Sequence, residues 1–241
     1  MEKHYLYDTH IHTIETSPCG KLGAADTIDY YASHGYAGLV ITDHLHEEFI
    51  RESDNRKGWD HIIDLYLAGY RAAKKRGSEI GFDVILGAEM RFNDNNNDYL
   101  IYDIDEAWLR NHPYVIRRSI HEFYEEFHNE VLIMHAHPYR DGNLTVFEDA
   151  VHGIELINTN PRHENHTDHA IKLAGRHHEY YLQAGSDMHQ EPDRCQAGII
   201  TKQRIRDSHE YAEVIRSGNY DLYAPKFPLY LNEFHKLINS R

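Results

Sequence analysis

Short apolar segments alternate with longer amphipathic segments along most of the chain. The short segments have the continuous apolar character of buried strands, as in AGLVIT at residues 37–42. They predict strands over residues 5–12, 37–42, 82–86, 131–134, 153–157, 180–184 and 198–201, with a further short strand over 98–102. The amphipathic segments predict helices over residues 24–34, 60–76, 113–129, 163–175, 208–217 and 229–238.

This alternation determines the expected fold. Strands that alternate with helices form βα units and a mostly parallel sheet. The length of 241 residues suits a single α/β barrel, which we expect in preference to an open, doubly wound sheet. No stretch rich in Pro, Gly or Ser divides the chain, so the sequence predicts one domain over residues 1–241.

Composition and charge narrow the classes of protein. The net charge of −14 argues against binding to long nucleic acid, because that function needs a basic surface. The two cysteines, Cys19 and Cys195, do not suggest a disulfide framework. The first residues contain no apolar signal core, and no segment approaches the roughly 20 apolar residues of a membrane span. We therefore expect a cytoplasmic protein without membrane partners, and the sequence leaves its oligomeric state open.

Histidines and carboxylates gather at one end of the predicted strands. The chain has 21 histidines, and several of them directly follow an apolar run. In α/β barrels the carboxyl ends of the strands form the face on which active sites are built. The polar residues at these ends are His10, His12, Asp43, His44, Glu89, His135, His137, Asn158, Asp187 and His189.

The spacing within this set suggests metal binding. His10 and His12 are two residues apart, so they point to the same side of a strand and can hold one ion. The same spacing recurs at positions 135/137 and 187/189. Imidazoles with carboxylate oxygens suit Zn²⁺, Mn²⁺ or Fe²⁺, and Glu89 is the best candidate for a bridging carboxylate. An aspartate–histidine hydrogen-bond network without metal is the alternative, but burying so many ionisable groups without an ion would be costly.

Six motifs resemble, in the same order, the signatures of the polymerase and histidinol phosphatase (PHP) family. They are DTHIHT (8–13), ITDH (41–44), GAE (87–89), HAHP (135–138), IELIN (154–158) and GSDMH (185–189). The resemblance implies a distorted (β/α)7 barrel, a centre of two or three divalent transition metals, and hydrolysis of phosphoesters. It implies a first metal bound by His10, His12, Glu89 and Asp187, a second bound by Glu89 and His137, and a third bound by His44 and His189.

The sequence departs from the family pattern at three places. In the loop after HIHT, where many members have a ligand of the third metal, IETSPCGKL offers Glu15 or Cys19. Where many members have a histidine after the glutamate, DYLIY offers Asp98 as a ligand. The motif HAHP contains an extra histidine, His135, which we expect beside the ligands or among the catalytic groups.

A phosphorylated substrate needs cationic partners. Arg91, Arg140 and Arg162 each follow a motif on the expected active face, and each could bind phosphate oxygens. Ordinary pairing with nearby carboxylates is the alternative for each arginine.

Taken together, these features predict a phosphatase that hydrolyses a small phosphomonoester with a metal-activated water. The catalytic candidates are Asp187, Glu89 and His135, and Asp187 or a histidine of the active face would handle the proton. A phosphodiesterase or exonuclease on short nucleotides is the nearest alternative. A metal-dependent amidohydrolase is another, but no lysine follows a motif strand to bridge its metals. A non-catalytic PHP-like binding module is the third.

Overall fold

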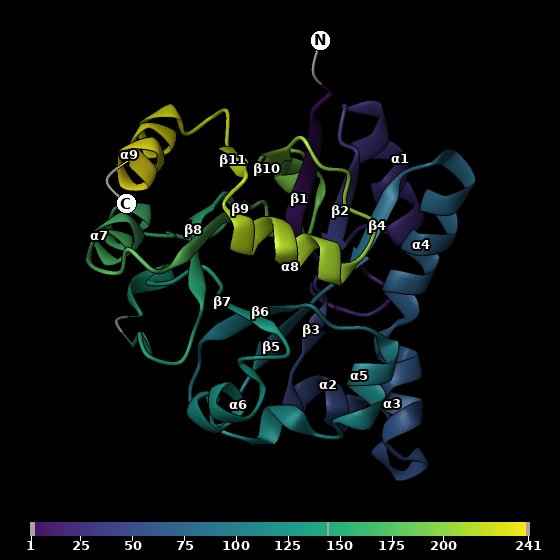
Figure 1. Ribbon diagram of the computed structural model, residues 1–241. Helices are drawn as coiled ribbons and strands as arrows, with labels where there is room; N and C mark the ends of the chain where they lie inside the picture. The colour runs from purple at the N-terminus through teal and green to yellow at the C-terminus, as the bar shows by residue number, and fades with distance from the viewer. Residues whose placement is uncertain (1–2, 144, 240–241) are drawn as a thin grey trace.

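Two mixed β-sheets form the centre of the protein, with helices packed around them (Figure 1). The computed structural model describes residues 3–143 and 145–239. One sheet has the order β11–β10–β1–β2–β4; its strands are β1 (Tyr5–Ile11), β2 (Gly38–Ile41), β4 (Asp83–Leu86), β10 (Gly198–Thr201) and β11 (Tyr220–Tyr223). The other has the order β3–β5–β6–β7–β8–β9; its strands are β3 (His44–Leu45), β5 (Ala88–Arg91), β6 (Asp98–Tyr102), β7 (Leu132–His135), β8 (Gly153–Asn158) and β9 (Tyr181–Gly185).

Strand direction corrects the expectation of a mostly parallel sheet. β1, β2 and β4 run parallel, as do β7, β8 and β9, but β6 is antiparallel to both of its neighbours. β10 is antiparallel to β1 and β11. The connection from β5 to β6 spans only residues 92–97, which allows a hairpin, whereas a parallel crossover needs about a dozen residues or more. The reversal places Asp98, the first residue of β6, opposite Arg91 at the end of β5.

Backbone hydrogen bonds join the two sheets at the carboxyl ends of the parallel strands. His12 N donates to Met188 O (3.0 Å) and Met188 N donates to His10 O (3.3 Å), so the segment after β9 lies beside the end of β1. Glu89 N donates to Asp43 O (3.1 Å), which continues the pairing of β2 with β4 into the second sheet. Side chains from both sheets therefore meet at one edge.

Helices cover the outer faces of the sheets. α1 (Ala24–Ser33) packs on α4 (Ala68–Ile80), which packs on β4. α7 (Thr167–Arg176) packs on β8, and α9 (Pro228–Asn239) packs on α7. α8 (Ser208–Ser217) contacts β6 and β9. The remaining elements are α2 (Glu47–Glu52), α3 (Trp59–Tyr66), α5 (Glu106–Asn111), α6 (Ile120–Phe127) and the 3₁₀ turns η1 (Asn55–Lys57), η2 (Val115–Arg117), η3 (Arg140–Gly142) and η4 (Glu191–Asp193).

The core between the sheets and the helices is largely apolar, and hydrogen bonds pair the polar groups that lie beneath α8. Every residue of β2 and β4 is buried. The Tyr211 hydroxyl donates to Gln183 Oε1 (3.0 Å), Gln183 Nε2 donates to the Tyr102 hydroxyl (2.9 Å), and that hydroxyl donates to Thr9 O (2.9 Å). This chain of hydrogen bonds links α8 to strands of both sheets and satisfies polar groups that burial would otherwise penalise. Within the described ranges, the helices are too short or too polar to cross a membrane.

The helix predicted over residues 60–76 is two helices, α3 and α4, which break at Leu67. The Thr16 hydroxyl accepts a hydrogen bond from Gly69 N (3.0 Å) and donates one to Tyr66 O (3.0 Å). A side chain inserted in this way takes up backbone groups that a continuous helix would pair internally.

Other boundaries also differ from the predictions. The region 113–129 contains η2 and α6, and α6 begins after Ser119 with a capping box to Glu122. α4 continues past residue 77 and ends at Gly81, whose φ of 75° suits a left-handed cap. The elements β3, β5, β11, α2 and α5 have no predicted counterpart. By contrast, β6, β10 and α8 have the predicted bounds.

Candidate metal centre

Four side chains converge where β1, β5 and the segment after β9 meet. His10 Nε2 and His12 Nε2 lie 3.1 Å apart, and both histidines are fully buried. Glu89 Oε2 lies 3.3 Å and Asp187 Oδ1 3.2 Å from His12 Nε2. Both carboxylates also approach His10 Nε2 to 3.5 Å. Alternate residues of a strand face the same side, so the spacing of the two histidines produces this cluster directly.

Glu155, on β8, orients His10 from behind. Its Oε1 lies 3.0 Å from His10 Nδ1, and its Oε2 accepts hydrogen bonds from His137 N (2.9 Å) and Asn158 Nδ2 (2.8 Å). Because an ionised carboxylate only accepts, Nδ1 of His10 donates to Glu155, which leaves Nε2 as the nitrogen that can bind a cation among the converging side chains. Glu155 had no predicted role, although an isolated acid inside the apolar run GIELI is a recognisable signal.

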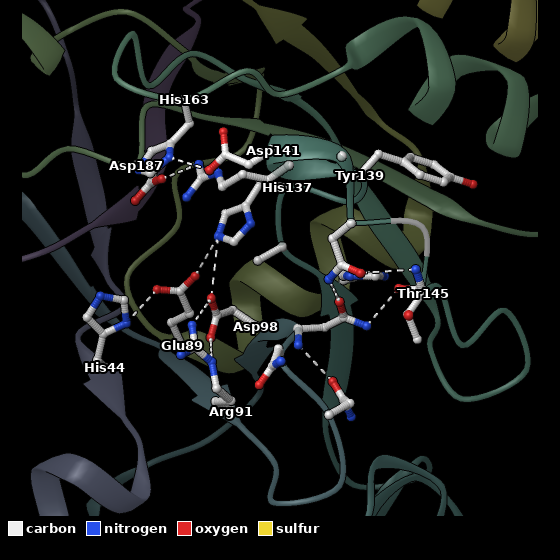
Figure 2. A pocket seen from close by; sticks show the side chains of 18 of the residues that line it. His44, Glu89, Arg91, Asp98, His137, Tyr139, Asp141, Thr145, His163 and Asp187 are labelled. Atoms are coloured by element: carbon white, nitrogen blue, oxygen red, sulfur yellow. Dashed lines mark hydrogen bonds and ion pairs between the residues drawn. The ribbon is translucent and has the colours of Figure 1, made fainter.

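A second group contains Glu89, Asp98 and His137, with all ligand atoms close to one another (Figure 2). His137 Nε2 lies 2.9 Å from Glu89 Oε1 and 3.9 Å from Asp98 Oδ2. Asp98 also accepts two hydrogen bonds from Arg91, of 2.8 and 2.7 Å. Glu89 belongs to both groups, which is the position expected of a bridging carboxylate.

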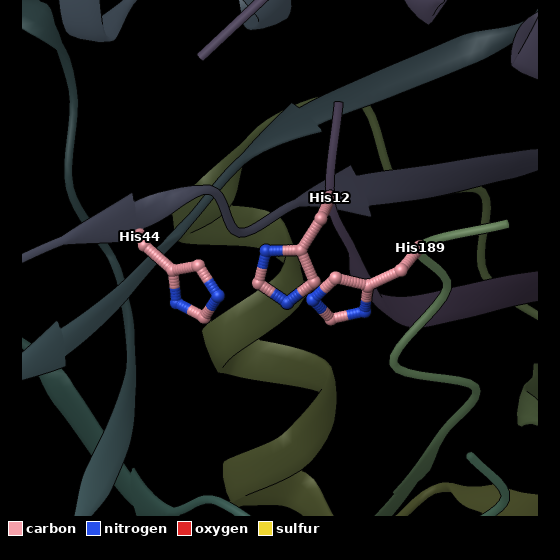
Figure 3. A group of neighbouring side chains, drawn as sticks. All are labelled: His12, His44 and His189. Carbon is pink, nitrogen blue, oxygen red and sulfur yellow. The ribbon is translucent and has the colours of Figure 1, made fainter. Parts of the chain in front are cut away.

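A third group contains His12, His44 and His189, and Figure 3 shows the ring of His12 between the other two. The ring of His12 lies 4.3 Å from that of His44 and 4.2 Å from that of His189, measured between centroids. Cys19 is exposed as a residue, and it lines the same cavity as His44 and His189. Burial would raise the pKa of the thiol, but the neighbouring His189 and His44 lower it to about 6. Cys19 is not itself a member of the third group, but of the two predicted options it is the one that lies in the cavity wall beside His44 and His189.

Glu15, the other option, lies elsewhere. Its two carboxylate oxygens lie 3.0 and 3.1 Å from Ala24 N, at the start of α1. A carboxylate in this position satisfies a free backbone N–H and interacts favourably with the helix dipole. Glu15 is in none of the ligand groups found among the described residues.

Asp43 fixes the loop that runs from His12 to Cys19. Its carboxylate accepts hydrogen bonds from Thr13 N, the Thr13 hydroxyl and the Ser17 hydroxyl, each 2.7 Å long. The Ser17 oxygen in turn accepts a hydrogen bond from His44 N (3.0 Å). Asp43 therefore supports the third group through the loop and does not point into it.

The electrostatic field of the centre favours cations. Burial would lower the pKa of His10, but the charges of Glu155, Asp187 and Glu89 raise it well above its ordinary value. Burial would raise the pKa of Glu89, but the charges of His44 and His10 hold it well below its ordinary value. The pKa of His12 is lowered well below its usual value, mainly by burial. The same negative field that favours a proton on His10 would favour a metal cation.

Unpaired atoms also fit divalent cations. His44 Nδ1 and Glu89 Oε2 lie only 2.8 Å apart, yet neither is aligned for a hydrogen bond and both atoms are buried. Buried polar atoms normally find a partner, so lone pairs that converge without one indicate a position for an ion. Imidazole, carboxylate and thiolate groups are the ligands of divalent transition metals.

A cavity of about 830 Å³ opens over the ligand groups, and the three predicted arginines line it. Each of them is paired with a carboxylate. Arg140 Nη2 donates to Asp187 and to Asn158 Oδ1, and Arg162 Nη2 lies 3.4 Å from Asp193 Oδ2. Ordinary ion pairing, the alternative given for each arginine, therefore describes their contacts in this structure.

His135 also lines the cavity but is in none of the three ligand groups. It is 2% exposed, and its ring stacks on that of Tyr99 with 5.2 Å between centroids. Its Nδ1 has no hydrogen-bond partner among the described residues. The structure places His135 beside the ligands, which is one of the two expected positions.

Backbone strain is concentrated at this face. His137, Tyr139, Asp141 and Asp187 have φ values of 31°, 70°, 51° and 52°. Non-glycine residues rarely adopt positive φ, and such conformations persist only where surrounding contacts enforce them. The bond from His137 N to Glu155 is one such contact.

Comparison with known proteins establishes the fold. No family model and no curated protein matches the sequence. The chain matches a two-domain protein from Bacteroides vulgatus that contains a predicted PHP-like metal-dependent phosphoesterase, with a TM-score of 0.63, 15% identity and 92% of the chain covered. It spans 65% of that protein's length.

Two further solved structures are similar over nearly their full length. PsfC from Pseudomonas syringae has a TM-score of 0.64 and 13% identity, with 97% of this chain and 98% of that chain covered. An amidohydrolase from Chromobacterium violaceum, with bound sulfate and no metal, has a TM-score of 0.53 and 16% identity, with 91% and 98% covered. The expected likeness to PHP-type proteins is confirmed at the level of the fold.

Proposed function

We propose that this protein is a metal-dependent phosphoesterase of the PHP type, and specifically a phosphatase that hydrolyses a small phosphomonoester. The observation that carries the proposal is the position of Glu89. It belongs to two ligand groups that together contain histidines and carboxylates from both sheets, beneath a cavity lined by three arginines. The PHP-like phosphoesterase named among the structural neighbours supports the same reaction class.

The proposed architecture is a single domain over residues 1–241, folded as a distorted (β/α)7 barrel. The hydrogen bonds between Met188 and the end of β1 support closure of the strands into one ring. The antiparallel β6 is the main distortion.

We assign two or three divalent transition ions, Zn²⁺, Mn²⁺ or Fe²⁺, to the three ligand groups. The proposed ligands are His10, His12, Glu89 and Asp187 for the first ion, and Glu89, Asp98 and His137 for the second. His44 and His189 of the third group are proposed for the third ion, with Cys19 added from the adjoining loop. The contact of Glu15 with α1 removes it from this assignment.

The residues of the chain would then act around a phosphorylated substrate. Bound ions supply an activated water and neutralise charge on the phosphoryl oxygens. Arg140 holds Asp187 as an anion and faces the cavity, so its planar guanidinium can also contact a phosphoryl oxygen. Arg91 and Arg162 line the same cavity and offer two further positions for such a contact.

The proposed substrate is small, because a cavity of about 830 Å³ has the size of typical small-molecule sites. The net charge of −14 disfavours long nucleic acid as a partner. We also propose a cytoplasmic protein without membrane partners, and its two free cysteines are in keeping with a reducing compartment.

The direct test is metal analysis of the purified protein followed by a panel of phosphomonoesters and phosphodiesters. We expect two or three transition-metal ions per chain, activity on monoesters, and loss of that activity with a chelator. Glu89→Gln should keep the fold and lose most of the activity. Full activity without transition metal, or a metal-loaded protein inactive on every phosphoester, would contradict the proposal.

A metal-dependent amidohydrolase is the second candidate, because one structural neighbour bears that name. None of the described residues that line the cavity is a lysine, so the usual bridging lysine of such sites has no counterpart there. Amide and lactone substrates in the same panel separate the two candidates.

A further inference from the structure

A histidine–aspartate pair lies in the wall of the cavity, separate from the ligand groups. His163 Nδ1 lies 2.8 Å from Asp141 Oδ2 (Figure 2), and both residues line the cavity together with Glu89 and Asp187. Asp141 directly follows Arg140, whose guanidinium contacts Asp187. The pair is therefore next to the place where the phosphoryl group of a substrate would lie.

Asp141 is fixed in position by the segment that carries the histidine. Its backbone N donates to Glu164 O (2.8 Å), and its Oδ1 accepts from Glu164 N (3.1 Å). Its φ of 51° is enforced by these contacts. Because the carboxylate accepts, the Nδ1–H of His163 donates to it, and Nε2 becomes the atom that can exchange a proton with a substrate.

Among the described residues, the other histidines of the cavity are less suited to give a proton to a leaving group. Among the described histidines that line the cavity, His44, His137 and His189 contact the carboxylates of the ligand groups. His135 has no partner at Nδ1 to orient its ring. The side chain of His163 is 37% exposed, so it can recover a proton from solvent after each turnover.

We propose that His163 is the general acid of this enzyme and that Asp141 is its positioning residue, an inference that rests on the proposed phosphatase function. The oxygen of water bonds to phosphorus, and the bond from phosphorus to the leaving oxygen breaks, with its electron pair going to that oxygen. The proton of His163 Nε2 joins the leaving oxygen and gives a free alcohol. The attacking water releases one proton to solvent, and His163 takes one proton back.

The test compares leaving groups of different basicity. Wild type, His163→Asn and Asp141→Asn are assayed with 4-nitrophenyl phosphate, phenyl phosphate and a simple alkyl phosphate. A good leaving group needs no proton, whereas an alkoxide does. We expect His163→Asn to lose about 10²–10⁴-fold in kcat with the alkyl phosphate, and less than about tenfold with 4-nitrophenyl phosphate. Asp141→Asn should show the same dependence on the leaving group, with a smaller loss of kcat for each ester.

The control is His121→Asn, which removes a similar exposed pair, His121 Nε2 with Asp149 Oδ1 at 3.0 Å, outside the cavity. It should match wild type on all three esters, and metal content should be unchanged in every variant. Equal losses across the three esters, or no loss, would overturn the role of His163. A wild-type protein that hydrolyses none of them would instead overturn the phosphatase proposal, and this inference with it.

Discussion

Replacing Glu155 with glutamine should weaken metal binding without unfolding the protein. The two oxygens of Glu155 are not equivalent, because Oε2 accepts from both His137 N and Asn158 Nδ2, whereas Oε1 faces only His10 Nδ1. In Glu155→Gln, an NH₂ group in place of Oε2 would face two hydrogen-bond donors, His137 N and Asn158 Nδ2. The amide should therefore place its NH₂ toward His10 and keep its oxygen on the two donors.

This orientation reverses the tautomer of His10. Nδ1 would have to accept a hydrogen bond, and the proton would move to Nε2, the atom that faces Glu89 and Asp187. A protonated Nε2 cannot ligate an ion. Loss of such an outer partner typically reduces metal affinity by 10–100-fold, which corresponds to about 1.4–2.7 kcal/mol.

Competition with a chromophoric chelator measures this affinity, and ¹⁵N NMR of the histidine rings reports the tautomer. The matched control is Glu148→Gln, which alters a glutamate–histidine contact with His177 outside the ligand groups. A Glu155→Gln protein that binds metal as tightly as wild type, with the His10 proton still on Nδ1, would refute the reasoning.

Three further predictions concern stability and the third ligand group. Gly69→Ala places a methyl group in overlap with the Thr13 hydroxyl and should destabilise the protein by about 1–3 kcal/mol. Gly175→Ala, whose methyl group would have its nearest atom at 3.7 Å, should stabilise the protein slightly. Urea unfolding measures both changes in stability, and changes of the same sign would contradict the packing argument. Cys19→Ser should reduce metal content by one ion per chain and leave the other sites filled, so full occupancy by elemental analysis would exclude the thiol as a ligand. The pKa of His152 is lowered from 6.5 to about 4, mainly by burial and then by the charge of a neighbouring arginine. The unfolded chain therefore binds the extra proton between these pH values, and stability should fall by roughly 1–2 kcal/mol as pH drops from 6.5 to 4, once partial exposure is allowed for. His152→Gln should flatten this dependence in urea midpoints, and an unchanged slope would assign it to other groups.

Much of the centre could be predicted from the sequence because its geometry is local. Residues two apart on a strand share a face, and parallel strands end at a common edge, so His10 and His12 could be grouped without coordinates. Asp98 lies at the same edge for a different reason, which is the direction of its strand. It begins a strand that runs in the opposite direction, after a connection too short for a crossover.

The parts that could not be predicted depend on contacts between distant segments. Glu15 and Cys19 lie in one loop, and their spacing from His12 gives no reason to prefer either. The hydrogen bonds of Asp43 with Thr13 and Ser17 fix the course of this loop. In the resulting conformation the thiol faces the histidines and the carboxylate caps α1.

β5 was missed for a different reason. Its sequence AEMR contains two charged residues, so it lacks the continuous apolar run of a buried strand. Both charges are compensated only in the folded protein, Glu89 by the histidines and Arg91 by Asp98. Glu89 and Arg91 line the cavity, and the same two charges interrupt the apolar pattern from which a buried strand is predicted.

The hydroxyl of Thr16 makes a backbone amide of α4 into a distant reporter of the metal centre. Thr16 lies in the loop between His12 and Cys19, and it accepts the hydrogen bond of Gly69 N. Exchange of this amide proton with solvent requires that hydrogen bond to open. Ions that order the loop should therefore slow deuterium uptake at the Gly69 amide. Gly69 is far from the loop in sequence, so the NMR signal of this one amide would report the occupancy of the centre without any substrate.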